Sequence, residues 1–287
     1  MPFTPYTCTS PDDPAREDDG LFGPGSVTWR IMNTRIMWVA ALRALYLQAL
    51  HPRVIRGTLQ NAPGITQAVD GWARLRRTRK FIETRTFGTT AEAERAGRRV
   101  RTIHQALTGT DPDGTRYRLD EPGLLLWVHC GEVASCVDIA RRSRLPFSAA
   151  ELDAFVAEQR ASAELIGIDR SAAPTSMAEL DAYYEQIRPW LYASDEAKHA
   201  LRVIMLPPVP DGIRMLKLGM PPVSALAFST LPRWAREMYG RPGGPLSEAA
   251  ANAGLLAARL MFSQQRLFSG AMRAVHQAES AGEKVLR

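Results

Sequence analysis

The sequence is poor in cysteine and has no long uninterrupted apolar run. Its 287 residues include three cysteines, Cys8, Cys130 and Cys136, too few for a disulfide framework and typical of a reducing compartment. No stretch of about 18 apolar residues free of charge occurs, so we expect no transmembrane helix. The first residues are acidic and proline-rich, unlike a signal peptide. We therefore predict a cytoplasmic protein without a membrane span.

Several signatures of well-known chemistries are also missing. There is no Gly-x-Ser-x-Gly elbow, no Gly-x-Gly-x-x-Gly turn and no P-loop, so a serine hydrolase or a nucleotide cradle is not indicated. Cys130 and Cys136 lack the spacing of a zinc site. Paired Glu-x-x-His motifs and Cys-x-x-Cys-His are absent as well, which argues against a di-iron bundle and against covalently attached haem.

Lysine is scarce, and the positive charge is concentrated in one segment. Only four of the 36 basic residues are lysines, and the formal net charge is +6. Residues 74–101 hold nine arginines and one lysine against three glutamates, so this segment carries +7 and the rest of the chain −1. Such a segment suits nucleic acid, membrane phosphates or an anionic ligand, but it is equally compatible with a solvated helix face. No recognised nucleic-acid module accompanies it, and we predict no nucleic-acid partner.

The hydrophobic pattern favours an all-α fold. Apolar residues make up 45% of the chain, enough for a sizeable core, and alternating strand patterns are rare. We predict an irregular N-terminal arm over 1–26, followed by a single helical domain over 27–287. Apolar periodicity, capping pairs and breakers place helices at 27–50, 53–60, 70–85, 89–107 and 123–141, helix starts at Ser148 and Ser176, a turn at 109–114, a loop over 207–222, a break at 240–245 and a final helix over 246–279.

Three of the five histidines lie in apolar helical contexts. His104 follows the helical stripe of Ala93, Ala96, Val100, Ile103 and Leu107, and it is therefore expected to face the interior. His51 closes the first apolar helix, and His129 lies inside the most apolar one. His199 and His276 are expected at the surface. An isolated interior histidine is more often a hydrogen-bonded core residue than a ligand.

The helix that precedes His104 carries a polar face. Arg74, Arg77 and Thr78 have the i, i+3, i+4 spacing of one helix face, which Phe81 continues. Two guanidinium groups are costly to bury without carboxylates or a bound anion. The face is therefore either an anion-binding wall or simply solvated surface.

Five segments, in order, resemble a known family. They are LYLQALHP (45–52), RLRRT (74–78), FG (87–88), RRVRTIHQALTG (98–109) and LLLWVHCGEVASC (124–136). The pattern is similar to that of the haem-dependent oxygenases that include latex clearing protein (rubber oxygenase) and the fungal mycophenolate-pathway oxygenase, and it is nearest to their short bacterial branch. The likeness covers about residues 25–190.

The resemblance implies a globin-like helical fold that holds non-covalent haem b. It implies that His104 is the proximal iron ligand and that Arg74, Arg77 and Thr78 occupy the family's distal Arg-x-x-Lys-Thr positions. The family's lysine is Arg77 here, and arginine stays protonated and is a very poor metal ligand. The distal acid of the family has no counterpart within 53–65.

Together, these features lead to one principal hypothesis and two alternatives. The principal one is a haem b oxygenase or oxidative tailoring enzyme of secondary metabolism that uses O2 or peroxide on a small organic substrate. In it Arg74, Arg77, Thr78 and His51 belong to the reaction site, and Phe81 and His129 help His104 and the arginines to hold the cofactor. The alternatives are a non-catalytic or peroxidase-like haem protein, and a haem-free helical protein that binds nucleic acid or acidic lipid.

Overall fold

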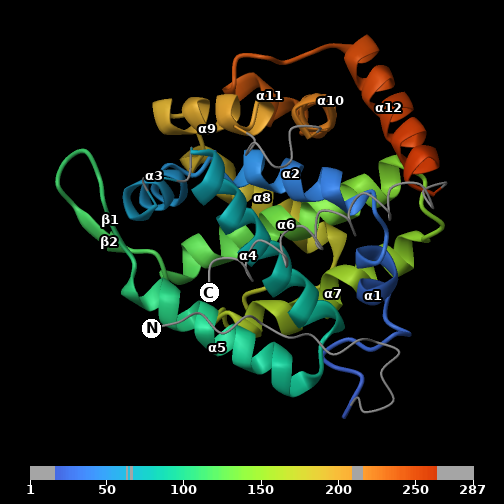
Figure 1. Ribbon diagram of the computed structural model, residues 1–287, viewed down its shortest axis with the longest axis horizontal. Coiled ribbons are helices and arrows are strands. Elements are labelled where there is room, and N and C mark those ends of the chain that lie inside the picture. Colours follow the sequence, from blue (N-terminus) through green and yellow to red (C-terminus); the bar gives the residue numbers. More distant parts are fainter. Residues whose placement is uncertain (1–16, 63, 65–66, 209–215, 264–287) are drawn as a thin grey trace, which may run out of the picture.

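The computed structural model describes residues 17–62, 64, 67–208 and 216–263. Within these residues the chain is predominantly helical, with one small antiparallel hairpin (Figure 1). The elements are α1 (Val27–Met32), α2 (Met37–Gln48), α3 (Pro52–Asn61), α4 (Ala68–Phe87), α5 (Thr90–Ala106), β1 (Thr108–Thr110), β2 (Arg116–Arg118), α6 (Pro122–Arg142), α7 (Ala149–Leu165), α8 (Met177–Ile187), the 3-10 turn η2 (Arg188–Trp190), α9 (Asp195–Met205), α10 (Leu216–Ser229), α11 (Arg233–Met238) and α12 (Pro245–Ser263). The predicted all-α class is confirmed.

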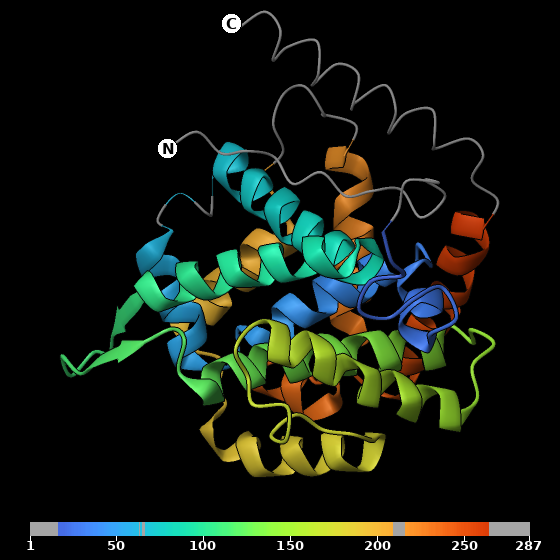
Figure 2. The same cartoon turned by 90° about the horizontal axis from the view of Figure 1, so that it is seen from below.

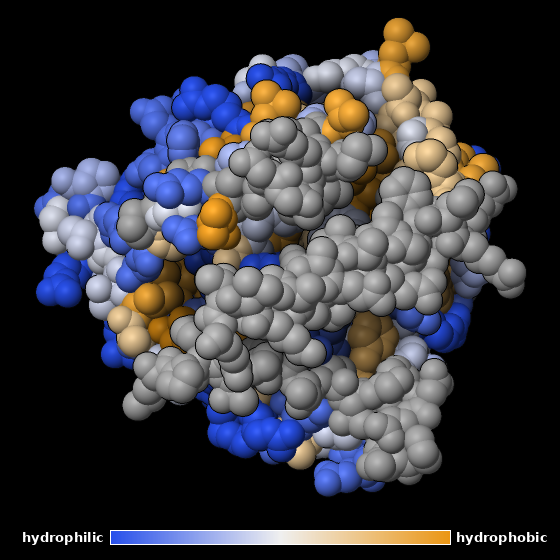
Figure 3. All heavy atoms as spheres, in the orientation of Figure 1, coloured by the Kyte–Doolittle hydropathy of each residue, from blue (hydrophilic) through white to orange (hydrophobic). Residues whose placement is uncertain are grey.

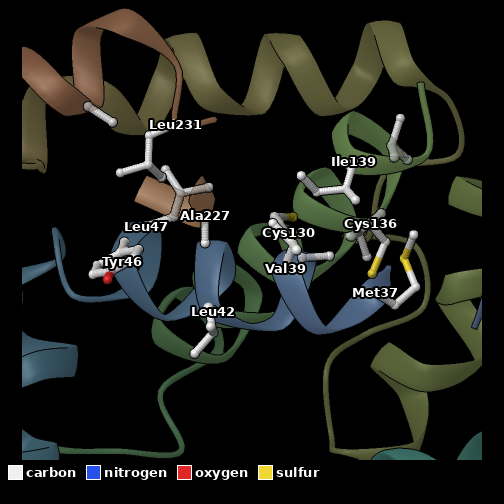
Figure 4. Packing of buried hydrophobic residues seen from close by; sticks show 14 of the residues in the cluster. Met37, Val39, Leu42, Tyr46, Leu47, Cys130, Cys136, Ile139, Ala227 and Leu231 are labelled. Carbon is white, nitrogen blue, oxygen red and sulfur yellow. The ribbon is translucent and has the colours of Figure 1, made fainter. Parts of the chain in front are cut away.

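Helix α2 lies at the centre and packs chiefly against α6 and α10. Figure 4 shows the side chains that meet there, among them Val39 and Leu47 of α2, Ile139 of α6 and Ala227 of α10. Gln48 connects α2 with α6. Its side-chain amide donates to the Val128 carbonyl at 3.0 Å, and its backbone carbonyl accepts from the Trp127 indole at 3.1 Å. This tightly packed pair forms the framework of the molecule.

Helices α4 and α5 pack against each other on one side of α2, whereas α6 and α7 lie on the other (Figure 2). A capping box starts α5: the Thr89 hydroxyl accepts from the Glu92 backbone, and the Glu92 carboxylate accepts from the Thr89 backbone. A second, smaller apolar cluster joins the four helices. It consists of Leu125, Ala163, Ile166, Ile168 and Ala173, with Phe81, Val100 and Leu126 partly buried against it.

The hairpin β1–β2 joins α5 to α6 and is held to α3. Gly109 lies opposite Tyr117, and a Cβ at position 109 would meet the Tyr117 ring at 2.2 Å, so only glycine fits. The Tyr117 hydroxyl donates to the Arg53 carbonyl at 2.8 Å, and Asp111 accepts from Arg53 and Arg56, both at 2.8 Å. The predicted turn at 109–114 is the loop of this hairpin, whose two short strands the sequence pattern did not indicate.

Two helix predictions are corrected. The predicted helix 27–50 is divided into α1 and α2, because the Thr34 hydroxyl donates to the Ile31 carbonyl at 2.7 Å and the chain turns after Asn33. The predicted loop over 207–222 is wrong from residue 216 onward, where α10 begins and includes Pro221 and Pro222. Burial of Ala227 and Phe228 in the main core stabilises α10 despite these prolines.

Other predicted features agree or lie outside the described part. The helices predicted at 53–60, 70–85, 89–107 and 123–141 are present, as are the caps at Ser148 and Ser176. Residues 17–26 contain turns and no helix before Val27. Residues 1–16 of the predicted arm, Cys8, residues 264–279 of the predicted final helix, and His276 lie outside the described residues.

The described residues include one helix, α6, that is long and apolar enough to cross a membrane. Two thirds of its most apolar window is buried inside the fold (67%). This burial is what is expected of a core helix, which can be as long and as apolar as a membrane span because protein surrounds it. Figure 3 shows that hydrophobic side chains also reach the surface over α12, where Leu246, Leu260 and Met261 are exposed.

Candidate functional site

The predicted ligand His104 lies in the last turn of α5, on the side of Arg74 in α4. Its side chain is half-buried, and its Nδ1 is buried without a hydrogen-bond partner among the described residues. Burial and the positive charge of Arg74 lower the pKa of His104, partly offset by Asp120, which raises it. The imidazole is thus kept neutral, which is the form that coordinates a metal. The stripe that predicted this position is only partly interior: Ala93 and Ala96 are fully buried, but Ile103 is 47% exposed.

The basic face of α4 lies near His104 at Arg74, whose positive charge acts on the imidazole. Arg74, Arg77 and Thr78 are exposed at this end of the helix. Surrounding protein and the charge of Arg77 nevertheless lower the pKa of Arg74, although part of its side chain remains open to solvent. Two cations side by side on one helix face create a local preference for an anion.

Further along the same face, Phe81 and Arg85 reach the interior. The Arg85 guanidinium lies over the Phe81 ring, 5.5 Å from its centroid, and forms an ion pair with Glu132 of α6. The Arg85 side chain is only 5% exposed, and its Nε has no partner within the described part of the chain. The sequence analysis missed both Arg85 and Glu132. The available signal was the spacing. Arg85 follows Arg74 by eleven residues, about three helical turns, so both lie on the same face of α4.

His129 is brought close to this ion pair. It precedes Glu132 by one turn of α6 and is 4% exposed. Burial and the nearby Arg85 lower the pKa of His129 to about 3, so the ring is neutral at physiological pH. A narrow gap adjoins the ring, lined by Cys130, Val133, Val156, Pro174 and Leu180, and it has no room for a water molecule. Ligand pockets are far larger, so we do not assign a cofactor to it.

His51 lies apart from the α4 face. It precedes α3, and its Nδ1 is buried without a partner among the residues described. Burial and Arg53 lower its pKa, whereas Asp111 and Glu121 raise it. These charged groups belong to α3, the hairpin and the turn before α6, and so His51 shares its surroundings with the hairpin rather than with Arg74 and Arg77.

Most arginines of the basic segment are exposed, and only Arg85 is buried. Arg95 and Arg98 are exposed, and Arg98 forms only a surface pair with Glu94 at 3.5 Å. Arg101 instead donates to the Leu165 carbonyl at the end of α7, so it fixes α5 to that helix. Within the described residues, no group of three or more His, Cys, Asp or Glu side chains could hold a metal ion. A single neutral histidine is the donor that this site offers.

These observations define a predominantly helical protein in which His104 has a lowered pKa and a buried, unpartnered Nδ1 beside a basic helix, while His51 shares both properties near the hairpin. The chain belongs to the family described as ER-bound oxygenase mpaB/B′/rubber oxygenase, catalytic domain, whose model matches residues 29–262. The family resemblance inferred from the five segments is confirmed, and the match extends beyond them into α12. No curated protein and no solved structure matches the chain.

Proposed function

We propose that this protein is a haem b-dependent oxygenase that acts on a small organic substrate with O2 or peroxide. The observation that carries the proposal is the neutral His104, whose buried Nδ1 is unpartnered, beside the Arg74 face in a member of an oxygenase family. Bound haem would supply the redox chemistry with the oxidant. The family defines the oxygenase class, and the cofactor, oxidant and substrate size are parts of our proposal.

The residues present fit a haem. A porphyrin supplies four nitrogen donors, so the protein needs to add only one neutral imidazole, which His104 provides. Haem propionates are anionic, and Arg74 and Arg77 offer the planar donors that pair with carboxylates. Apolar side chains beside them, Phe81 and Val100, supply walls for the macrocycle.

The side chains would divide the tasks of this site. His104 would hold the iron. Arg74 would pair with a propionate or, together with Thr78, donate hydrogen bonds to the oxidant or orient the substrate. Arg77 replaces a lysine of the family motif, and because its guanidinium stays protonated it binds anions rather than the metal. His51, closer to the hairpin, serves at the margin of the site.

The proposal also places the protein in the cytoplasm, in the oxidative tailoring of a secondary metabolite. The buried α6 and the cysteine content support this placement. Purified chain should show a Soret band and should consume O2 or peroxide together with a substrate from a panel of small alcohols, phenols and alkenes. A red protein that turns over none of the panel would favour a non-catalytic or peroxidase-like haem protein, whereas a protein that gains no Soret band with added haem would contradict the proposal.

A further inference from the structure

The ion pair of Arg85 and Glu132 is only partly satisfied. Arg85 uses a terminal nitrogen for Glu132, while its Nε remains without a partner in the described part of the molecule. Glu132 accepts this bond through Oε1 alone, and no bond to its Oε2 is found among the residues described. Because charged groups inside proteins normally use all their hydrogen-bonding capacity, this pair has capacity left for a ligand.

The pair is open on the Glu132 side. Arg85 is almost completely enclosed, but 22% of the Glu132 side chain is exposed. A carboxylate held by an enclosed arginine and still reached by solvent can accept a hydrogen bond from a molecule that approaches from solvent. Phe81 contacts the guanidinium of the same pair and is itself only partly buried, so an apolar ring lies beside the pair.

The charges around this carboxylate indicate which ligand it prefers. Arg85 balances the charge of Glu132, and the adjacent His129 ring is neutral. Further along α4 stand Arg74 and Arg77, which disfavour a cation. The free carboxylate oxygen can only accept a hydrogen bond. The matching ligand group is therefore a neutral donor, such as a hydroxyl, carried by an apolar body.

We propose that Glu132, positioned by Arg85, binds the hydroxyl group of an otherwise apolar substrate, a phenol or an alcohol, while Phe81 contacts its hydrocarbon part. This inference rests on the proposed function, because it names the substrate class of the same site. Arg85 is a positioning residue: it fixes one oxygen of Glu132 and leaves the other for the substrate.

The test compares two probes that differ only in the donor, 4-butylphenol and its methyl ether 4-butylanisole. Binding to the haem-loaded full chain is measured by calorimetry and by the change in the Soret band. Wild type should bind the phenol about tenfold or more tightly than the ether, since hydrogen bonds to charged groups are the strong ones. Equal affinities, or no binding of either probe, would overturn the inference.

Two variants and one control make the test specific. Glu132→Gln keeps the shape of the side chain and should reduce the preference for the phenol to less than threefold. The double variant Arg85→Met with Glu132→Leu replaces the pair by apolar groups, so it folds without a buried unpaired charge and should show no preference. Glu248→Gln alters a similar pair with Arg236, between α11 and α12, and should keep the full preference.

The outcomes separate the two proposals. A protein with a Soret band that does not prefer the phenol contradicts only the substrate inference. A chain that never takes up haem contradicts the proposed function and this inference with it. Tighter binding of 4-butylbenzylamine than of 4-butylphenol would identify a cation site and overturn the neutral-donor argument.

Discussion

His104 on α5 and Arg74 on α4 interact electrostatically across the contact of two adjacent helices. The positive charge of Arg74 acts together with burial to lower the pKa of the imidazole, and the Nδ1 of that ring has no hydrogen-bond partner among the described residues. Burial is the larger of these two effects, and both favour the neutral imidazole, the form that coordinates a metal. The candidate site therefore depends on the surroundings of the histidine and not on the histidine alone.

Replacing the proposed ligand should abolish stable haem binding. His104→Ala removes the proposed iron ligand, and we expect the affinity to fall by about 100-fold or more, because even residues that merely support a ligand contribute roughly 10–100-fold. Haem titration followed by the Soret band measures this. His199→Ala, at an exposed histidine, is the control and should bind haem as wild type does. Unchanged binding by His104→Ala would move the ligand to another residue.

The buried neutral His129 should make the fold sensitive to acid. Its pKa is about 3 in the folded chain, against about 6.5 when unfolded. Between these values the unfolded state binds the extra proton, so the contribution of His129 is fully present above pH 6.5 and is lost as the pH falls. The loss approaches about 5 kcal/mol near pH 3. Urea unfolding at pH 7, 6, 5 and 4 should therefore give a flatter profile for His129→Phe than for His199→Phe, and parallel profiles would contradict the assignment.

Breaking the Arg85–Glu132 pair should be much more costly than breaking a surface pair. Glu132→Ala leaves an enclosed guanidinium without a counter-charge, and we expect a loss of about 3 kcal/mol in the free energy of unfolding. Glu83→Ala, which removes the exposed partner of Arg79 on the same helix, should cost about 0.5 kcal/mol or less. Denaturant unfolding of both variants checks this, and equal losses would show that Arg85 is solvated.

The contact between α5 and α7 should not tolerate a larger residue. A Cβ at Gly97 would approach the Leu165 side chain to 2.5 Å and its carbonyl oxygen to 2.6 Å. Gly97→Ala should therefore cost about 1–3 kcal/mol through overpacking. Gly123→Ala, in α6 with nothing within 4 Å of its Cβ, should be neutral or slightly stabilising. Thermal unfolding compares the two, and similar melting temperatures would contradict the close packing.

Local signals in the sequence predicted much of the fold. Thr89 with Glu92 and Ser148 with Glu151 form the expected capping boxes, because these bonds involve only neighbouring residues. The break between α1 and α2 was missed because its polar residues, Asn33, Thr34 and Arg35, lie between two strongly apolar stretches, while the turn depends on the Thr34 hydroxyl. The helical state of Pro221 was missed because it depends on burial of the rest of α10, a tertiary effect.

The candidate site was only partly accessible to the same reasoning. Spacing placed Arg74, Arg77 and Thr78 on one helix face, and periodicity turned His104 toward the protein. Glu132 escaped notice because its partner Arg85 lies 47 residues away in the sequence. A pairing of that kind follows from how α4 and α6 meet, which no local pattern encodes.

The most direct test of the account is the visible spectrum of the purified full chain, recorded in the ferric form, after reduction and after addition of CO. We predict a Soret band that responds to reduction and to CO in wild type and in His199→Ala. In His104→Ala the band should be lost or greatly weakened. A wild-type protein that shows no Soret band, even after haem is added, would contradict the central claim.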